Sequence, residues 1–94
     1  MINDIVIIGA GVSGMTSAIY LKRAGVNPVL IEMKRPGGQI NFASSVENFP
    51  SYINVTGREL SNKIYEQVTS LGVEYIKDEV VNVFKEDEIF VLYL

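Results

Sequence analysis

One segment, residues 5–32, constrains the fold of this chain more than any other; it reads IVIIGAGVSGMTSAIYLKRAGVNPVLIE. It opens with four apolar residues, Ile5 to Ile8, a run typical of a parallel strand that is covered on both faces. A G-x-G-x-x-G pattern follows. Its first glycine permits a tight turn, its second allows backbone to approach a pyrophosphate, and its third lets the next helix pack against the strand. Gly9, Gly11 and Gly14 therefore predict a strand, a turn and a helix in succession.

A carboxylate, Glu32, stands at the end of the next predicted strand. The helix is expected to begin near Ser13, where its free N–H groups and its dipole favour an anion, and to end at Gly25. Val29 to Ile31 then form the second strand. Glu32 follows the glycines by roughly the 20 residues expected of an acid that accepts hydrogen bonds from ribose hydroxyls. A carboxylate there repels a 2′-phosphate, which disfavours NADP at this position and leaves FAD or NAD.

Composition excludes several classes of function. Ninety-four residues form at most one small domain, and a net charge of −3 provides no basic stripe for nucleic acid. The chain contains no cysteine and no histidine, so it offers no disulfide, no thiolate metal site and no Ser-His or Cys-His nucleophile. We therefore expect no catalytic residue and no metal ligand within it. The apolar start lacks a signal peptide's basic region and cleavage site, and no run is long enough to cross a membrane, so a cytoplasmic location is expected.

A long irregular loop is predicted from residue 33 to residue 55 because proline, glycine, serine and asparagine are frequent there. A loop of this length in a small domain is usually functional. Gly37 and Gly38 permit close approach of backbone to a flat ligand, and the amides of Gln39 and Asn48 can both donate and accept hydrogen bonds.

The remaining residues predict one helix and three strands. Thr56 is the expected N-cap of a helix over 57–71, with Glu59 completing a capping box and an apolar stripe facing the core. A strand over 73–77 follows, parallel to the earlier strands through a right-handed crossover. The segment 80–94 alternates as a hairpin with charged residues at its turn. With the βαβ unit at 4–32, the chain predicts an α/β fold.

Several short motifs, in this order, resemble the N-terminal FAD-binding segment of the thioredoxin reductase family, a group of pyridine nucleotide-disulfide oxidoreductases. They are G-A-G-V-S-G, I-E, P-G-G-Q-I, V-E-N-F-P and T-G. The resemblance covers almost the whole chain and implies a Rossmann-like, three-layer FAD-binding domain, incomplete at the start of an antiparallel meander. Two residues depart from the family pattern: Val12 replaces a frequent proline, and Ser51 replaces the usual glycine after E-N-F-P.

The resemblance also assigns roles to particular residues. The FAD pyrophosphate would lie along Gly9, Gly11, Ser13 and Gly14. Glu32 would bind the adenosine ribose, and the adenine would lie beside Met33 and near Val80. The flavin would lie along Gly38, Gln39 and Asn48.

For the parent enzyme the resemblance implies electron transfer from NAD(P)H through FAD to a disulfide protein of the thioredoxin type. The NAD(P)H domain and a C-x-x-C pair would lie outside residues 1–94, so this chain alone is expected to be inactive. We also expect a homo-oligomer, because the first strand would keep an unpaired edge. Two alternatives stay open: a fragment of a thiol-free relative such as a ferredoxin-NADP reductase, and a standalone module that binds NAD, ADP or no nucleotide.

Overall fold

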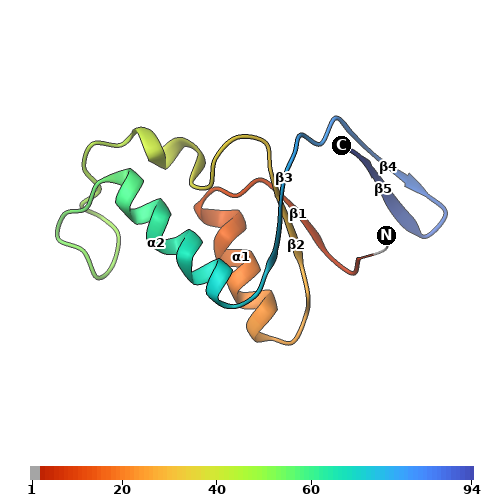
Figure 1. The fold of residues 1–94 in the computed structure, drawn as a ribbon, viewed down its shortest axis with the longest axis horizontal. Coiled ribbons are helices and arrows are strands. Elements are labelled where there is room, and N and C mark those ends of the chain that lie inside the picture. The colour runs from red at the N-terminus through yellow and green to blue at the C-terminus, as the bar shows by residue number, and fades with distance from the viewer. Residues whose placement is uncertain (1–2) are drawn as a thin grey trace.

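The computed structural model describes residues 3–94, which form a small parallel sheet, two helices and a separate hairpin (Figure 1). The sheet has the order β1-β2-β3, so the first strand lies at one edge and β2 lies in the centre. Its strands are β1 (Val6–Ile8), β2 (Val29–Glu32) and β3 (Glu74–Lys77). Both pairings are parallel, as the crossovers through intervening helices require.

The two helices cover the same face of the sheet (Figure 1). They are α1 (Val12–Arg23) and α2 (Gly57–Ser70), and they pack on each other. Helix α1 also contacts β1 and β2, the latter with its first three residues buried, and α2 contacts β3 through the rings of Tyr65 and Tyr75. The buried core formed in this way contains Met15, Ala18, Ile19, Leu30, Leu60, Ile64 and Val68.

Helix α2 begins where the sequence predicts. The Thr56 hydroxyl accepts a hydrogen bond from the backbone N–H of Glu59 at 3.1 Å, which is one half of the expected capping box. Gly57 comes directly after the cap because the chain crosses closely there. A Cβ on Gly57 would lie 1.6 Å from the carbonyl oxygen of Ile40, so only glycine fits.

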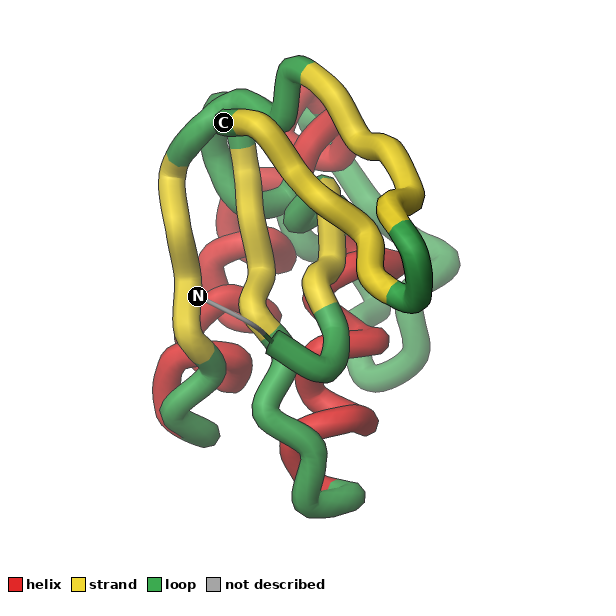
Figure 2. The backbone as a smooth tube through the Cα atoms, turned by 90° about the vertical axis from the view of Figure 1, so that its right-hand side faces the viewer, coloured by secondary structure: helices red, strands yellow, loops and turns green. Residues whose placement is uncertain are grey.

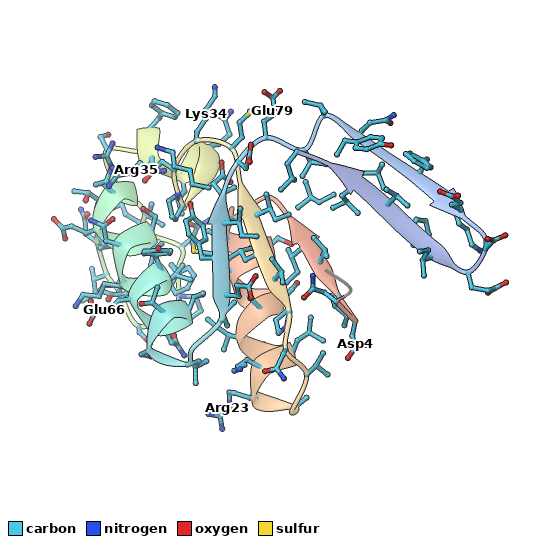
Figure 3. The ribbon with its side chains drawn as sticks, turned by 45° about the vertical axis from the view of Figure 1, so that its right-hand side comes forward. Asp4, Arg23, Lys34, Arg35, Glu66 and Glu79 are labelled. Carbon is cyan, nitrogen blue, oxygen red and sulfur yellow. The ribbon has the colours of Figure 1, made fainter. Side chains whose placement is uncertain are left out.

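The opposite face of the sheet is only partly covered. A hairpin of β4 (Asn82–Glu86) and β5 (Ile89–Tyr93) lies on that side and diverges from the sheet (Figures 1 and 2). A groove of about 850 Å³ separates the two, and side chains from both walls project into it (Figure 3). Ile8 is 55% exposed here, so the prediction that the first strand is covered on both faces is wrong for this chain. The hairpin stands away from the sheet instead of packing on β1.

The segment 33–55 is more regular than predicted. It contains a 3₁₀ helix, η1 (Gly38–Phe42), and an antiparallel bridge between Val46 and Val55 that closes the remainder into a loop. Short 3₁₀ turns of this kind satisfy backbone groups that an irregular loop would leave unpaired. Within residues 3–94, no helix is long and apolar enough to cross a membrane.

Candidate nucleotide-binding site

The glycine turn between β1 and α1 has three different geometric requirements. Gly9 has a φ of +101°, which side chains rarely tolerate. A Cβ on Gly14 would lie 1.9 Å from the carbonyl oxygen of Gly9, so the third glycine is needed for contact between helix and strand. A Cβ on Gly11 would meet no atom within 4 Å. The second glycine therefore faces open space, where an approaching ligand would benefit from its bare backbone.

The first turn of α1 is suited to an anion. Gly11 is the N-cap and provides no side-chain cap, and the first turn contains no acidic residue. Ser13 is exposed in this turn. Backbone N–H groups at a helix start carry the positive end of the dipole, so a phosphate placed here would be stabilised.

Glu32 reaches across to the glycine turn from the end of β2. One oxygen of its carboxylate, Oε1, accepts a hydrogen bond from the backbone N–H of Ala10 at 2.8 Å. The other, Oε2, accepts one from the N–H of Lys34, also at 2.8 Å. The carboxylate is thus fixed beside the turn, at the position expected for an acid that binds a ribose.

The P-G-G segment, residues 36–38, lies against the same turn. Gly37 donates its N–H to the carbonyl of Ala10 at 2.7 Å and forms a parallel bridge with Gly11. Gly38, which is exposed, would carry a Cβ 3.7 Å from the Cα of Gly11. The structure therefore brings the two glycine-rich segments together, although they are distant in the sequence.

The role expected of Gly37 needs correction. Gly37 is buried, and a Cβ there would lie 2.4 Å from the Cβ of Ser61 and 2.8 Å from the amide nitrogen of Asn41. Its missing side chain makes room for protein, not for a flat ligand. Only its neighbour, Gly38, keeps an exposed backbone in this segment.

The remaining predicted residues lie around this centre at different distances from it. Met33 directly follows Glu32 and is 50% exposed. Asp78 donates its N–H to the Glu32 carbonyl at 3.0 Å, which holds the segment leading to the half-buried Val80 beside the end of β2. Gln39 is exposed in η1, and Asn48 is exposed in the loop beyond it. Within residues 3–94, neither of these amide side chains is hydrogen-bonded to the glycine turn.

The polar residues that hold the site together were missed by the sequence analysis. Ser61 is completely buried on α2, and its hydroxyl hydrogen-bonds to Asn41, whose amide in turn contacts the P-G-G segment. A serine within the apolar stripe of a helix was the available signal, because a buried hydroxyl requires a partner.

One ionisable group near the site is perturbed. Burial raises the pKa of the Tyr75 hydroxyl above its ordinary value of 10.0, and negative charge on Tyr65 and Glu32 raises the pKa further. The rings of Tyr65 and Tyr75 pack edge to face with centroids 5.3 Å apart. The Tyr75 side chain therefore stays protonated at neutral pH and packs, uncharged, against the core.

These features fit a dinucleotide. The space over Gly11 suits a diphosphate, the helix start suits its charge, and the Glu32 carboxylate suits a ribose diol across the turn. Charged side chains at the same end of the sheet, Lys34 and Glu79, point outward (Figure 3). The fold and site together define a dinucleotide-binding α/β domain.

The chain belongs to the FAD binding domain family, whose model matches residues 4–88. It is similar to thioredoxin reductases: 41% identical to that of Bacillus subtilis over 87 residues, which is 93% of this chain and 28% of that protein. It is 47% identical to that of Ureaplasma parvum over 73 residues, or 78% and 24% of the two chains. The crystal structure of Lactococcus lactis thioredoxin reductase matches with a TM-score of 0.93 at 37% identity, over 98% of this chain and 30% of that one.

These comparisons confirm the predicted family resemblance, the Rossmann-like α/β fold and FAD as the cofactor. The chain spans less than a third of the length of these relatives. It corresponds to the FAD-binding domain of thioredoxin reductase-like flavoenzymes.

Proposed function

We propose that this chain provides one wall of the FAD site, along the adenosine diphosphate and part of the flavin, in a flavoenzyme that passes electrons from NAD(P)H through FAD to a disulfide. The observation that supports it best is the pairing of open space over Gly11 with the Glu32 carboxylate fixed beside Ala10. FAD would supply the redox chemistry of its isoalloxazine ring, and the protein would supply binding and orientation.

Each part of the cofactor has proposed contacts. The pyrophosphate would lie along the glycine turn and the start of α1, where backbone N–H groups can donate to it. Glu32 would accept hydrogen bonds from the ribose hydroxyls, with adenine between Met33 and Val80. Gly38, Gln39 and Asn48 would lie on the flavin side. The pyrophosphate contacts would come from Gly9, Gly11, Ser13 and Gly14.

Binding FAD would require Glu32 to serve two partners. Its Oε1 atom accepts from Ala10, yet a carboxylate oxygen has a second lone pair that can accept from a ribose hydroxyl. Oε2 accepts one hydrogen bond, from Lys34, and likewise keeps a second lone pair for a ribose hydroxyl. The carboxylate can therefore receive the sugar without releasing the turn, and little reorganisation is needed.

Electron transfer would require more than these residues. Because the chain contains no cysteine, it cannot form the dithiol that such an enzyme uses to reduce a partner. We expect residues 1–94 to bind FAD and to show no disulfide reductase activity. For the whole enzyme we predict a thioredoxin-like disulfide protein as partner and NAD(P)H bound by other residues. We also predict a homo-oligomeric state and a cytoplasmic location.

Equilibrium dialysis against FAD, NAD and ADP tests this function. We expect the chain to bind FAD more tightly than NAD, and ADP more weakly than FAD. A preference for NAD would remove the flavoenzyme assignment and favour a separate nucleotide-binding module. The matched test variant is Gly11→Ala, which adds a methyl group only to the proposed pyrophosphate space and should bind FAD more weakly.

A further inference from the structure

Asn41 links the P-G-G segment to helix α2. Its amide nitrogen Nδ2 donates to the carbonyl oxygens of Pro36 at 2.9 Å and Gly38 at 3.2 Å. Its Oδ1 accepts from the Ser61 hydroxyl at 2.7 Å. The same hydroxyl also lies 3.1 Å from the carbonyl of Arg58, so the shorter contact is the one with Asn41. All the hydrogen-bonding atoms of the Asn41 amide therefore face protein.

The backbone held by Asn41 is unusual. Gly37 and Gly38 have φ values of +107° and +58°, both in the left-handed region. Glycine reaches this region easily but also reaches many others, so the sequence alone does not select it. The two bonds from Asn41 close a small loop around Gly37, and this loop fixes the conformation of the segment.

This loop is also clamped between two parts of the molecule. On one side, Gly37 packs against Asn41 and Ser61, with no room for a Cβ. On the other side, its N–H is bonded to the carbonyl of Ala10, in the glycine turn. A continuous set of contacts thus runs from α2 through Asn41 to the proposed nucleotide site.

We propose that Asn41 is a positioning residue for the flavin half of the FAD site, acting through the conformation of the Pro36–Gly38 segment. This inference rests on the proposed function, in which Gly38 lies along the flavin side. Asn41 would not touch FAD, since its amide is already bonded to its own backbone and to Ser61. Its loss would lower the fraction of molecules with the binding conformation, and the apparent affinity falls by that fraction.

The chemistry of the side chain explains why asparagine occupies this position. An amide can donate to carbonyls and accept from a hydroxyl at the same time. Aspartate would keep the acceptor for Ser61 but would place negative charge against two carbonyl oxygens. Alanine would lose every bond. We therefore expect Asn41→Asp to weaken FAD binding at least as much as Asn41→Ala.

The test compares FAD with ADP in equilibrium dialysis of the full chain. Asn41→Ala removes three hydrogen bonds and should weaken FAD binding about 10-fold, as expected if the binding conformation falls to roughly a tenth of the molecules. ADP binding should fall much less than FAD binding, because the Glu32 carboxylate still holds the N–H of Ala10 in the glycine turn when the Gly37 contact loosens. A merely structural role would weaken the binding of FAD and ADP by the same factor. The matched control is Asn54→Ala, an exposed asparagine of the same loop that hydrogen-bonds to Ser45 and not to the P-G-G segment.

Amide hydrogen exchange without nucleotide provides a second readout. The N–H groups of Gly37 and Ile40, both hydrogen-bonded in the structure, should exchange faster in Asn41→Ala, while those of α1 should not change. Ser61→Ala should have a smaller effect in the Asn41→Ala background than in the wild type, because the two side chains act as one unit.

The outcomes separate this inference from the proposed function. If the wild type binds FAD and Asn41→Ala binds it equally well, the inference is wrong and the function stands. If FAD and ADP binding fall by the same factor, with faster exchange throughout α1, a global structural role replaces the positioning role. A wild-type chain that binds neither nucleotide would overturn the function and the inference together.

Discussion

The carboxylate of Glu32 accepts a hydrogen bond from the backbone N–H of Ala10 at 2.8 Å, which joins the end of β2 to the glycine turn. Ala10 is held on its other side as well, because its carbonyl accepts from Gly37 at 2.7 Å. Both backbone polar groups of this residue are thus fixed, the N–H by an acidic side chain and the carbonyl by the P-G-G segment. Glu32 therefore stabilises the shape of the site, besides the contact with the sugar that we propose for it.

Replacing Glu32 tests this double role. Glu32→Gln should weaken FAD binding about 10- to 100-fold, since hydrogen bonds to a charged group contribute roughly 1.5–3 kcal/mol. Isothermal titration calorimetry measures the loss. Glu66→Gln, on the exposed face of α2, is the matched control and should bind as the wild type does. Equal affinity in both variants would show that the carboxylate does not contact the ribose.

The second and third glycines should respond differently to alanine. Gly14→Ala should destabilise the fold by about 3 kcal/mol, because its Cβ would clash with the carbonyl of Gly9. Gly11→Ala should fold normally, since its φ of −72° and ψ of −175° suit any residue, but should lose FAD affinity about 10-fold or more. Urea unfolding and FAD titration of both variants check this. Unchanged FAD binding by Gly11→Ala would place the pyrophosphate elsewhere.

Ser51 is expected to store backbone strain. Its φ is +85°, a region that costs a non-glycine residue roughly 1–2 kcal/mol. Ser51→Gly should therefore raise the free energy of unfolding by about 1 kcal/mol, after the greater entropy of unfolded glycine is subtracted. Ser44→Gly, in the same loop but without a positive φ, should lower it instead. If urea denaturation shows the same decrease in the free energy of unfolding for both variants, Ser51 does not store backbone strain.

Tyr75 should make stability depend on alkaline pH. Because its pKa is raised in the folded chain, the unfolded chain loses the proton first as the pH passes about 10. Stability is then fully present below that pH and falls as the pH rises through the folded pKa. Tyr75→Phe should show a smaller fall than the wild type in urea unfolding at about pH 8 and 11. The control is Tyr20→Phe, which changes an exposed tyrosine on α1. If the free energy of unfolding falls equally in the wild type and in Tyr75→Phe, Tyr75 is not the source of the pH dependence.

Self-association is expected through the groove between sheet and hairpin. Ile8 and Phe90 are 55% and 67% exposed beside it, and exposed apolar patches of this kind favour protein contacts. Sedimentation equilibrium should show dimers that weaken in Phe90→Lys. Tyr20→Lys changes an exposed residue outside the groove and should leave the association unchanged. A wild type that stays monomeric at all concentrations would contradict self-association through the groove.

The sequence predicts features that are set by residues close together in the chain. It misses features that depend on contacts between residues distant in the chain. The βαβ unit follows from the glycine spacing and from β-branched residues, because each glycine has a steric reason to be there. Thr56 as a helix cap follows in the same way, since its bond to Glu59 spans three residues. Such features involve neighbours in the chain and can be read without a structure.

The parts that were missed require distant partners. The bond between Asn41 and Ser61 joins residues 20 positions apart; the apolar stripe around Ser61 indicates that its hydroxyl needs a partner, but no local pattern identifies Asn41 as that partner. Similarly, Gly37 looked suited to a ligand but is packed against Ser61. The exposure of Ile8 depends on where the hairpin lies, which alternation of polar and apolar residues does not determine.

In the proposed complex, the glycine turn and the Glu32 carboxylate receive the diphosphate and the ribose of FAD. An NMR titration of the ¹⁵N-labelled chain with FAD locates these contacts residue by residue. We expect saturable shifts of the backbone amides of Ala10, Gly11, Ser13 and Lys34, with little change along the exposed face of α2. Saturable shifts that lie elsewhere and leave Gly11 and Lys34 unmoved would contradict these contacts.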